Sequence, residues 1–332
     1  MISQGLHKMA DRNKRNSIEN KTRRSSLRCA VLVCVFVLVL LTMSACGGET
    51  ASARTDASVS DGGTAYEVPE TKGAVFDEAS AEGNSEVLVD LSHQNDGYFG
   101  VYCTSDVKIK LQVFKGDETY TYDVTANKVQ IYPLQLGNGQ YTIKVMKNIA
   151  DSKYSEIYVT SADVSIDDEF DPFLRPSQYA DYDKSSKCVT KAAELAASSS
   201  DANDYISNVY SYVCKNVKYD KKKAENIQPG YLPNPDETFS TGQGICFDYA
   251  SLAASMLRSQ GIPTKIIFGY VGDSGDLYHA WNMYYTKESG WVAVEFEVSK
   301  DQWNRLDLTF SANGADSSYI GDGSNYLDVY QF

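Results

Sequence analysis

The chain has 332 residues, with 44 Asp and Glu against 31 Lys and Arg, which gives a formal net charge of −13 at pH 7. This excess of negative charge argues against binding to nucleic acid and against charge-driven binding to anionic lipid. Only three histidines occur in the whole chain, which argues against a histidine-based metal site.

Residues 1–45 have the pattern of a secretory signal peptide. Basic residues precede an apolar run from Cys29 to Leu41, which is shorter than the roughly 20 residues of a spanning helix. The small residues Ser44 and Ala45 stand before Cys46, which resembles a bacterial lipobox. The resemblance implies cleavage before Cys46, lipid on its sulfur, and a place on the outer face of the cell membrane. An uncleaved anchor is the alternative, and it leaves the chain on the same side.

The next two segments differ in composition. Residues 46–83 are rich in small and polar residues, which predicts a disordered tether. Residues 84–166 alternate apolar and polar residues between turn signals, which predicts a small all-β sandwich domain. Its strands are expected at residues 86–91, 97–104, 108–114, 119–124, 128–132, 140–146 and 156–164. The segment holds no catalytic constellation, so we expect a spacer or docking module.

An acidic stretch from Asp163 to Pro172 leads into the second half of the chain. Clustered carboxylates suit calcium, but the spacing does not match an EF-hand, so we expect a solvated linker. Helices are predicted at 187–198 and 201–217. A polar loop through Pro235 follows, and we expect it to border a substrate cleft.

Cys246 stands at the start of a predicted helix. Ala250, Ala254 and Leu257 lie on one apolar stripe, and the glycines at 242 and 244 permit a tight turn just before it. Unpaired N–H groups and the helix dipole in the first turn stabilise an anion, so we expect a lowered thiol pKa there. A small buried core residue is the alternative interpretation of Cys246.

His279 lies in an aromatic, alternating run that predicts a strand over residues 277–285. It would share a strand face with Trp281, which could keep water from the imidazole. A structural histidine in the core is the alternative. A cysteine and a histidine in these settings suggest a thiolate nucleophile with an imidazole base, and hence acyl-transfer chemistry.

A third group should orient the imidazole. Glu295 lies in an expected strand over residues 291–298, and Asp307 lies in another over residues 303–310. A last strand is expected between residues 319 and 332. Spacing alone does not choose between the two carboxylates.

Three motifs, GQGICFDYASLAASMLRSQGIPTKIIFGY, YHAWNMYY and WNRLDLTF, occur in the order typical of the transglutaminase-like superfamily, which this segment resembles. The resemblance implies a papain-like α+β core over residues 175–332 with a Cys-His-Asp triad. It assigns the nucleophile to Cys246, the base to His279 and the aspartate to Asp307. Leu308 stands where the family's motif usually has proline, and Glu295 stays the rival for the third role.

The expected function is that of an extracytoplasmic thiol acyl-transfer enzyme, a cysteine hydrolase or a transglutaminase-type enzyme. It would act on peptide or carboxamide bonds of a peptide, protein or cell-wall substrate, and it would need no metal or organic cofactor. The alternative is a non-catalytic surface module that binds peptide or cell-wall material, because a fold does not by itself establish turnover.

Overall fold

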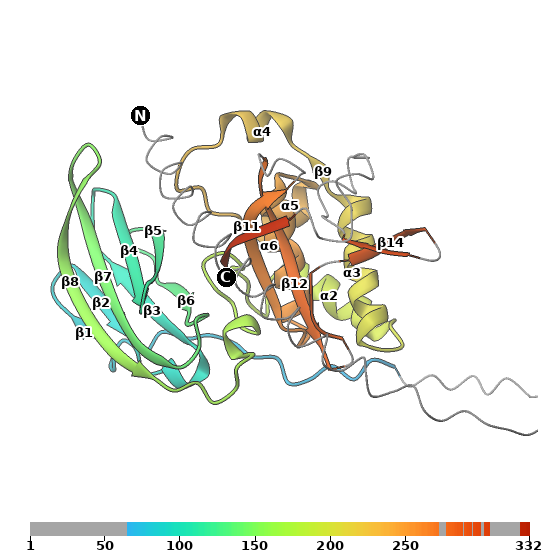
Figure 1. Cartoon of the computed structure of the whole chain (residues 1–332), viewed down its shortest axis with the longest axis horizontal. Helices are drawn as coiled ribbons and strands as arrows, with labels where there is room; N and C mark the ends of the chain where they lie inside the picture. Colours follow the sequence, from blue (N-terminus) through green and yellow to red (C-terminus); the bar gives the residue numbers. More distant parts are fainter. Residues whose placement is uncertain (1–64, 272–276, 288, 294, 300–301, 306–325) are drawn as a thin grey trace, which may run out of the picture. The chain divides into compact units, whose positions relative to one another are not determined.

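The computed structural model describes residues 65–271, 277–287, 289–293, 295–299, 302–305 and 326–332. Strands dominate the first part of this chain, whereas helices followed by a second group of strands form the rest (Figure 1). The fold is therefore α+β, as predicted. In the described ranges, no helix combines the length and the apolar character that crossing a membrane requires.

The first part is a sandwich of two antiparallel four-stranded sheets. One sheet has the order β1-β2-β3-β6 and the other has the order β5-β4-β7-β8. The strands are β1 (Glu82–Gly83), β2 (Val87–Asp90), β3 (Tyr98–Cys103), β4 (Ile109–Lys115), β5 (Glu118–Val124), β6 (Gln130–Pro133), β7 (Gly139–Ala150) and β8 (Lys153–Val164).

Alternation of buried and less buried residues, clearest in β4, explains why the sequence pattern located the sandwich. In β4, Ile109, Leu111 and Val113 are buried, whereas Lys110 and Gln112 between them are only half-buried. Successive side chains of a strand point to opposite faces, so one face fills the space between the sheets. The sandwich was predicted correctly, with strand ends within a few residues of those observed.

The helical part consists of α2 (Lys187–Ala197), α3 (Ala202–Asn216), α4 (Lys221–Asn226), α5 (Pro235–Thr241) and α6 (Cys246–Arg258). The short strands β9 (Lys218–Tyr219) and β10 (Gln243–Gly244) pair in parallel. The structure corrects the expected polar loop through Pro235, because α4 lies within it and α5 begins at its end. Asn234 accepts a hydrogen bond from the Glu237 N–H and Pro235 occupies the first turn, so α5 has a standard helix start.

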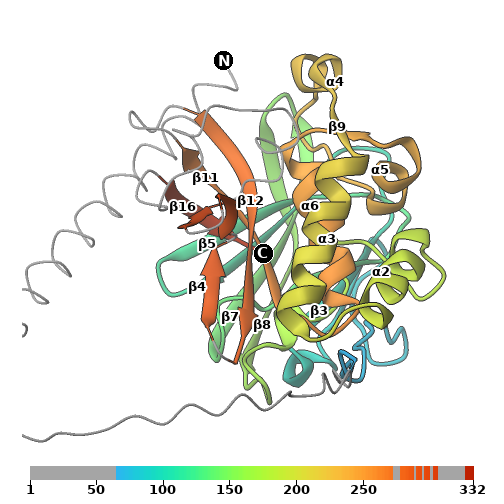
Figure 2. The same cartoon turned by 90° about the vertical axis from the view of Figure 1, so that its right-hand side faces the viewer.

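The second group of strands forms a sheet with the order β13-β12-β11-β16 and a separate hairpin, β14 with β15. Their bounds are β11 (Thr264–Val271), β12 (Leu277–Thr286), β13 (Gly290–Ala293), β14 (Glu295–Ser299), β15 (Gln302–Arg305) and β16 (Tyr326–Gln331). The strand expected over residues 291–298 is thus two strands. Helix α6 packs against α2 and α3 on one side and against β11 and β12 on the other (Figure 2).

The sandwich and the helix-containing part share one hydrophobic cluster. The ring of Phe332 lies 5.2 Å from that of Tyr120 and 5.6 Å from that of Tyr122, both on β5, and 4.7 Å from that of Tyr179. The same cluster includes Ala250 of α6. The two parts therefore bury apolar surface against each other.

Individual residues of the segment before β1 contact the rest of the protein from Tyr66 onward, in contrast to the tether expected as far as residue 83. The ring of Tyr66 stacks on that of Tyr205 at 5.4 Å, and its hydroxyl donates to the Gln260 carbonyl at 2.8 Å. Farther along, Phe76 lies so close to Gly100 that a Cβ there would come within 2.6 Å of its ring. These aromatic residues supply the buried surface that composition alone understated.

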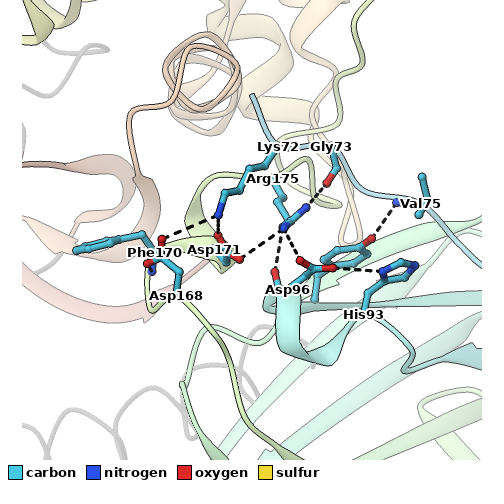
Figure 3. Close-up of polar contacts among 10 residues, drawn as sticks. Lys72, Gly73, Val75, His93, Asp96, Asp168, Phe170, Asp171 and Arg175 are labelled. Atoms are coloured by element: carbon cyan, nitrogen blue, oxygen red, sulfur yellow. Dashed lines mark hydrogen bonds and ion pairs between the residues drawn. The ribbon is translucent and has the colours of Figure 1, made fainter. Parts of the chain in front are cut away.

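The acidic connector is held by cations of the chain itself (Figure 3). Asp171 is buried and is bound by Lys72 and, at 3.5 Å, by Arg175. Arg175 also pairs with Asp96 at 2.7 Å and donates to the Gly73 carbonyl at 2.7 Å. The expectation of a solvated linker is therefore wrong at Asp171, where a buried carboxylate is paired as burial requires.

Candidate active site

The turn before α6 requires its glycines. Gly242 ends α5 with φ of +62°, in the left-handed region, and a Cβ there would lie 2.8 Å from the Asn216 carbonyl oxygen. Gly244 has a Cβ position only 2.6 Å from the Cβ of Asp248. Gly242 adopts its left-handed conformation without strain, and Gly244 leaves room for the start of α6. The two glycines thus permit the tight turn that the sequence pattern predicted.

Cys246 is the first residue of α6, with Ile245 as its N-cap. Its side chain is half-buried and packs against the cluster that contains Ala250 and Ala254. Among the described cysteines, Cys103 and Cys188 are buried, and burial raises the pKa of Cys103 to about 12. Cys246 therefore combines a helix start with access from outside the core.

Asp248, two residues farther along α6, is fully buried and caps the helix. Its carboxylate accepts a hydrogen bond from the Ile245 N–H at 2.8 Å, accepts another from the Tyr231 hydroxyl, and pairs with Lys223 at 2.7 Å. The sequence analysis missed this cluster. An acidic residue in the first helical turn was the available signal, because it is the usual place for a capping carboxylate.

His279 lies on β12, opposite Gly269 of β11, and is 5 % exposed. The next strand residues connect β12 to the helix: Asn282 donates to the Ala250 carbonyl at 3.0 Å, and Ala280 packs in the cluster of Ala250. Strand alternation puts His279 on the face of Trp281, as expected. Ala280 and Asn282 thus hold β12 against α6, and His279 alternates with them on the other face of the strand. The pairing of thiol and imidazole belongs to the proposal below.

Tyr278 is a second neighbour of the thiol that the sequence analysis did not single out. Partial burial raises the pKa of its phenol, and charge on Tyr330, Tyr270 or Cys246 would raise it further. Its ring stacks on Phe268 at 6.3 Å, and Phe268 contacts Phe247, the residue after Cys246, at 4.8 Å. Aromatic rings therefore line the sheet side of the helix start.

The remaining predicted residues are placed only in part. Glu295 is the first residue of β14 and lies opposite Arg305 in the register of β14 with β15. Its side chain lies outside the described residues. Asp307 and the expected strand beyond residue 305 also lie outside them, as does Cys46 with the whole leader.

Comparison with known protein families identifies the domain that contains α6 and β12. Residues 189–296 match the model of the transglutaminase-like superfamily. The chain contains a transglutaminase-like domain. The matched range includes Cys246, His279 and Glu295, and it ends before Asp307. The fold is accordingly α+β, with a transglutaminase-like core preceded by a β-sandwich, as predicted.

Relatives with this domain are longer proteins of which the chain matches a small part. It is 32% identical over 103 residues to a protein-glutamine gamma-glutamyltransferase of Pseudomonas aeruginosa. The aligned segment covers 26% of this chain and 15% of that protein. It is 25% identical over 143 residues to a protein of Methanocaldococcus jannaschii, covering 42% of this chain and 32% of the relative. A solved structure from Cytophaga hutchinsonii, provisionally assigned as a cysteine protease, aligns with a TM-score of 0.37 and 15% identity over 71% of this chain and 83% of its own.

Proposed function

We propose that this protein is an extracytoplasmic thiol acyl-transfer enzyme with Cys246 as its nucleophile. The observation that carries the proposal is the position of Cys246: an accessible thiol at a helix start, after a glycine turn, within the transglutaminase-like match. Backbone N–H groups at such a helix start can also stabilise the oxyanion that forms on the attacked carbonyl.

In the proposed reaction, His279 accepts the thiol proton as the sulfur of Cys246 attacks a peptide or carboxamide carbonyl. The C–S bond forms, the C–N bond breaks, and the leaving amine takes its proton from the imidazolium. Water or a second amine then attacks the thioester and releases Cys246. The first outcome is hydrolysis and the second is transamidation, and we favour hydrolysis because water is the more abundant nucleophile.

The test uses glutamine-containing peptides and peptidoglycan fragments, with and without a fluorescent primary amine. We expect release of ammonia or an amine by the wild-type protein, and none by Cys246→Ala. Equal turnover by the two proteins would overturn the nucleophile assignment. If neither acts on any substrate and Cys246 shows no selective labelling by a thiol probe, the protein is instead a binding module.

Asp307 is the proposed orienter of His279, from its place in WNRLDLTF, and Glu295 is the rival. The family match includes Glu295 and ends before Asp307, and it assigns the role to neither. Asp307→Asn and Glu295→Gln separate them, since loss of the orienter costs on the order of 10⁴-fold in turnover in the serine-protease case. We expect the larger loss from Asp307→Asn; a larger loss from Glu295→Gln transfers the role to Glu295.

We also propose a lipid anchor at Cys46, which rests on the leader sequence alone. Mass spectrometry of the membrane-extracted protein tests it. A mature N-terminus at Cys46 carrying a diacylglycerol group supports the anchor, whereas an unmodified Cys46 thiol contradicts it.

A further inference from the structure

Two side chains from one surface segment converge on a single carboxylate of α6. Residues 221–231 supply both the Lys223 ammonium, 2.7 Å from Asp248, and the Tyr231 hydroxyl that donates to the same carboxylate. Lys223 also lies 4.6 Å from the centre of the Tyr231 ring. Helix α4 itself has no buried residue, so these contacts contribute much of what fixes the segment on the protein.

The charge of Asp248 bears on the Cys246 thiol because of where Asp248 lies. Its side chain is fully buried and lies within the same helical turn as Cys246. Its carboxylate has the hydrogen bonds and the cation partner that a buried carboxylate requires. A negative charge so near a thiol opposes formation of the thiolate, unless a cation cancels it.

The remaining titratable groups around this turn do not supply that cation. Burial and the hydrogen bond to Asp248 raise the pKa of Tyr231 well above its usual value, and Glu237 of α5 adds to that effect, so Tyr231 is a neutral donor. Tyr278 of β12 likewise has a raised pKa. His279, the proposed base, alternates along β12 with Ala280 and Asn282, which contact α6, and no ion pair between it and Asp248 is present among the described residues. Lys223 is the cation that directly pairs with Asp248 in the described part of the chain.

We propose that Asp248 and Lys223 are positioning residues for Cys246: Asp248 fixes the first turn of its helix, and Lys223 cancels the charge of Asp248 within that turn. Their role in turnover rests on the proposed function, whereas their electrostatic effect on the thiol does not.

The experiment measures the rate of alkylation of Cys246 by iodoacetamide between about pH 5 and pH 10, with peptide mass spectrometry to resolve the individual cysteines. In Lys223→Met, we expect the midpoint of the pH–rate curve to move upward by about one pH unit. The double variant Lys223→Met/Asp248→Asn should return close to the wild-type midpoint, because both charges are gone.

Two matched variants separate charge from structure. Lys222→Met removes the same charge from the neighbouring exposed position of α4, and its midpoint should stay within about 0.2 pH units of wild type because the charge is screened by solvent. Lys223→Arg keeps the charge and should keep the wild-type midpoint. If Lys223→Met is folded and its curve overlaps that of the wild type, or if Lys222→Met shifts as much, the proposal is wrong.

This readout is independent of turnover. If the midpoint shifts but no substrate is found, the charge coupling is supported and only the acyl-transfer proposal is contradicted. Turnover by the wild type with no midpoint shift in Lys223→Met would support acyl transfer and contradict the charge coupling. Should Lys223→Met fail to fold, a loss of the wild-type midpoint in folded Lys223→Arg would overturn the proposal, and its retention would support it.

Discussion

Two helices of this domain begin with a cysteine in the first turn, and only one of them presents it. Cys188 is the second residue of α2 and Cys246 is the first residue of α6. Cys188 is fully buried, whereas Cys246 is half-buried. Position at a helix start is therefore not what distinguishes the candidate nucleophile.

The two helix starts also differ in the carboxylate near each of them. At α2, Asp236 accepts hydrogen bonds from the N–H groups of Lys187 and Cys188, both at 2.9 Å, so the anion-binding end of the helix is already occupied. At α6, Asp248 binds the Ile245 N–H and is paired with Lys223. A thiolate at α2 would therefore meet a carboxylate that shares its helix start, whereas the carboxylate at α6 is directly paired with a lysine.

The largest expected effect is the difference in reactivity between the two thiols. Burial raises the pKa of Cys188, and the hydrogen bond and charge of Asp236 raise it further. At pH 8, Cys246 should therefore react with iodoacetamide at least about 100-fold faster than Cys188 in the folded protein. Peptide mass spectrometry over a time course measures both. If Cys246 and Cys188 are alkylated at equal rates in the native protein, and both rates rise together in urea, the two helix starts do not differ in thiol reactivity.

Local sequence signals predicted most of this comparison. The apolar stripe of α6, the glycines before it and the alternation in β12 are short-range patterns, so the helix of Cys246 and the strand of His279 were located correctly. The sandwich strands were found for the same reason.

The contacts that distinguish the two helix starts could not be predicted in this way. Asp236 reaches α2 from a helix far along the chain, and Lys223 and Tyr231 meet Asp248 only through tertiary packing. Helix α4 is too short and polar to show an apolar stripe. Tyr66 gave no periodic signal, although its ring stacks on α3.

A smaller effect is expected from filling the space beside Asp248. Gly244→Ala places a methyl group where the Cβ of Asp248 is only 2.6 Å away, so the start of α6 must shift. Overpacking of this kind costs about 1–3 kcal/mol of the free energy of unfolding, measured by urea denaturation. Alkylation of Cys246 should change as well, because its turn moves, whereas Cys188 should stay unreactive.

Gly73→Ala is the matched control. Its Cβ would meet no atom within 4 Å, so the free energy of unfolding should stay within about 0.5 kcal/mol of wild type. An equal loss in both variants would show that the space beside Asp248 is not what Gly244 provides.

The smallest expected effect concerns the cap of α2. Partial burial alone would raise the pKa of Asp236, but hydrogen bonds from the Cys188 and Lys187 N–H groups outweigh it and hold that pKa below its usual value. Its folded-state pKa lies below the unfolded one, so the stabilisation is present at neutral pH and is lost as pH falls through the folded pKa. Asp236→Asn keeps a hydrogen-bond acceptor but loses the charge at the helix start, so it should cost about 0.5 kcal/mol at pH 7, with the two stability curves converging in acid.

The same variant divides the two causes that keep Cys188 unreactive. Burial is the larger cause, and Asp236→Asn leaves it in place while removing the negative charge. Alkylation of Cys188 at pH 8 should therefore rise by no more than about tenfold and stay well below that of Cys246. If Cys188 in Asp236→Asn reacts as fast as Cys246 while the protein stays folded, charge rather than burial separates the two helix starts, and Lys223 becomes the main reason that the thiol of α6 is the available one.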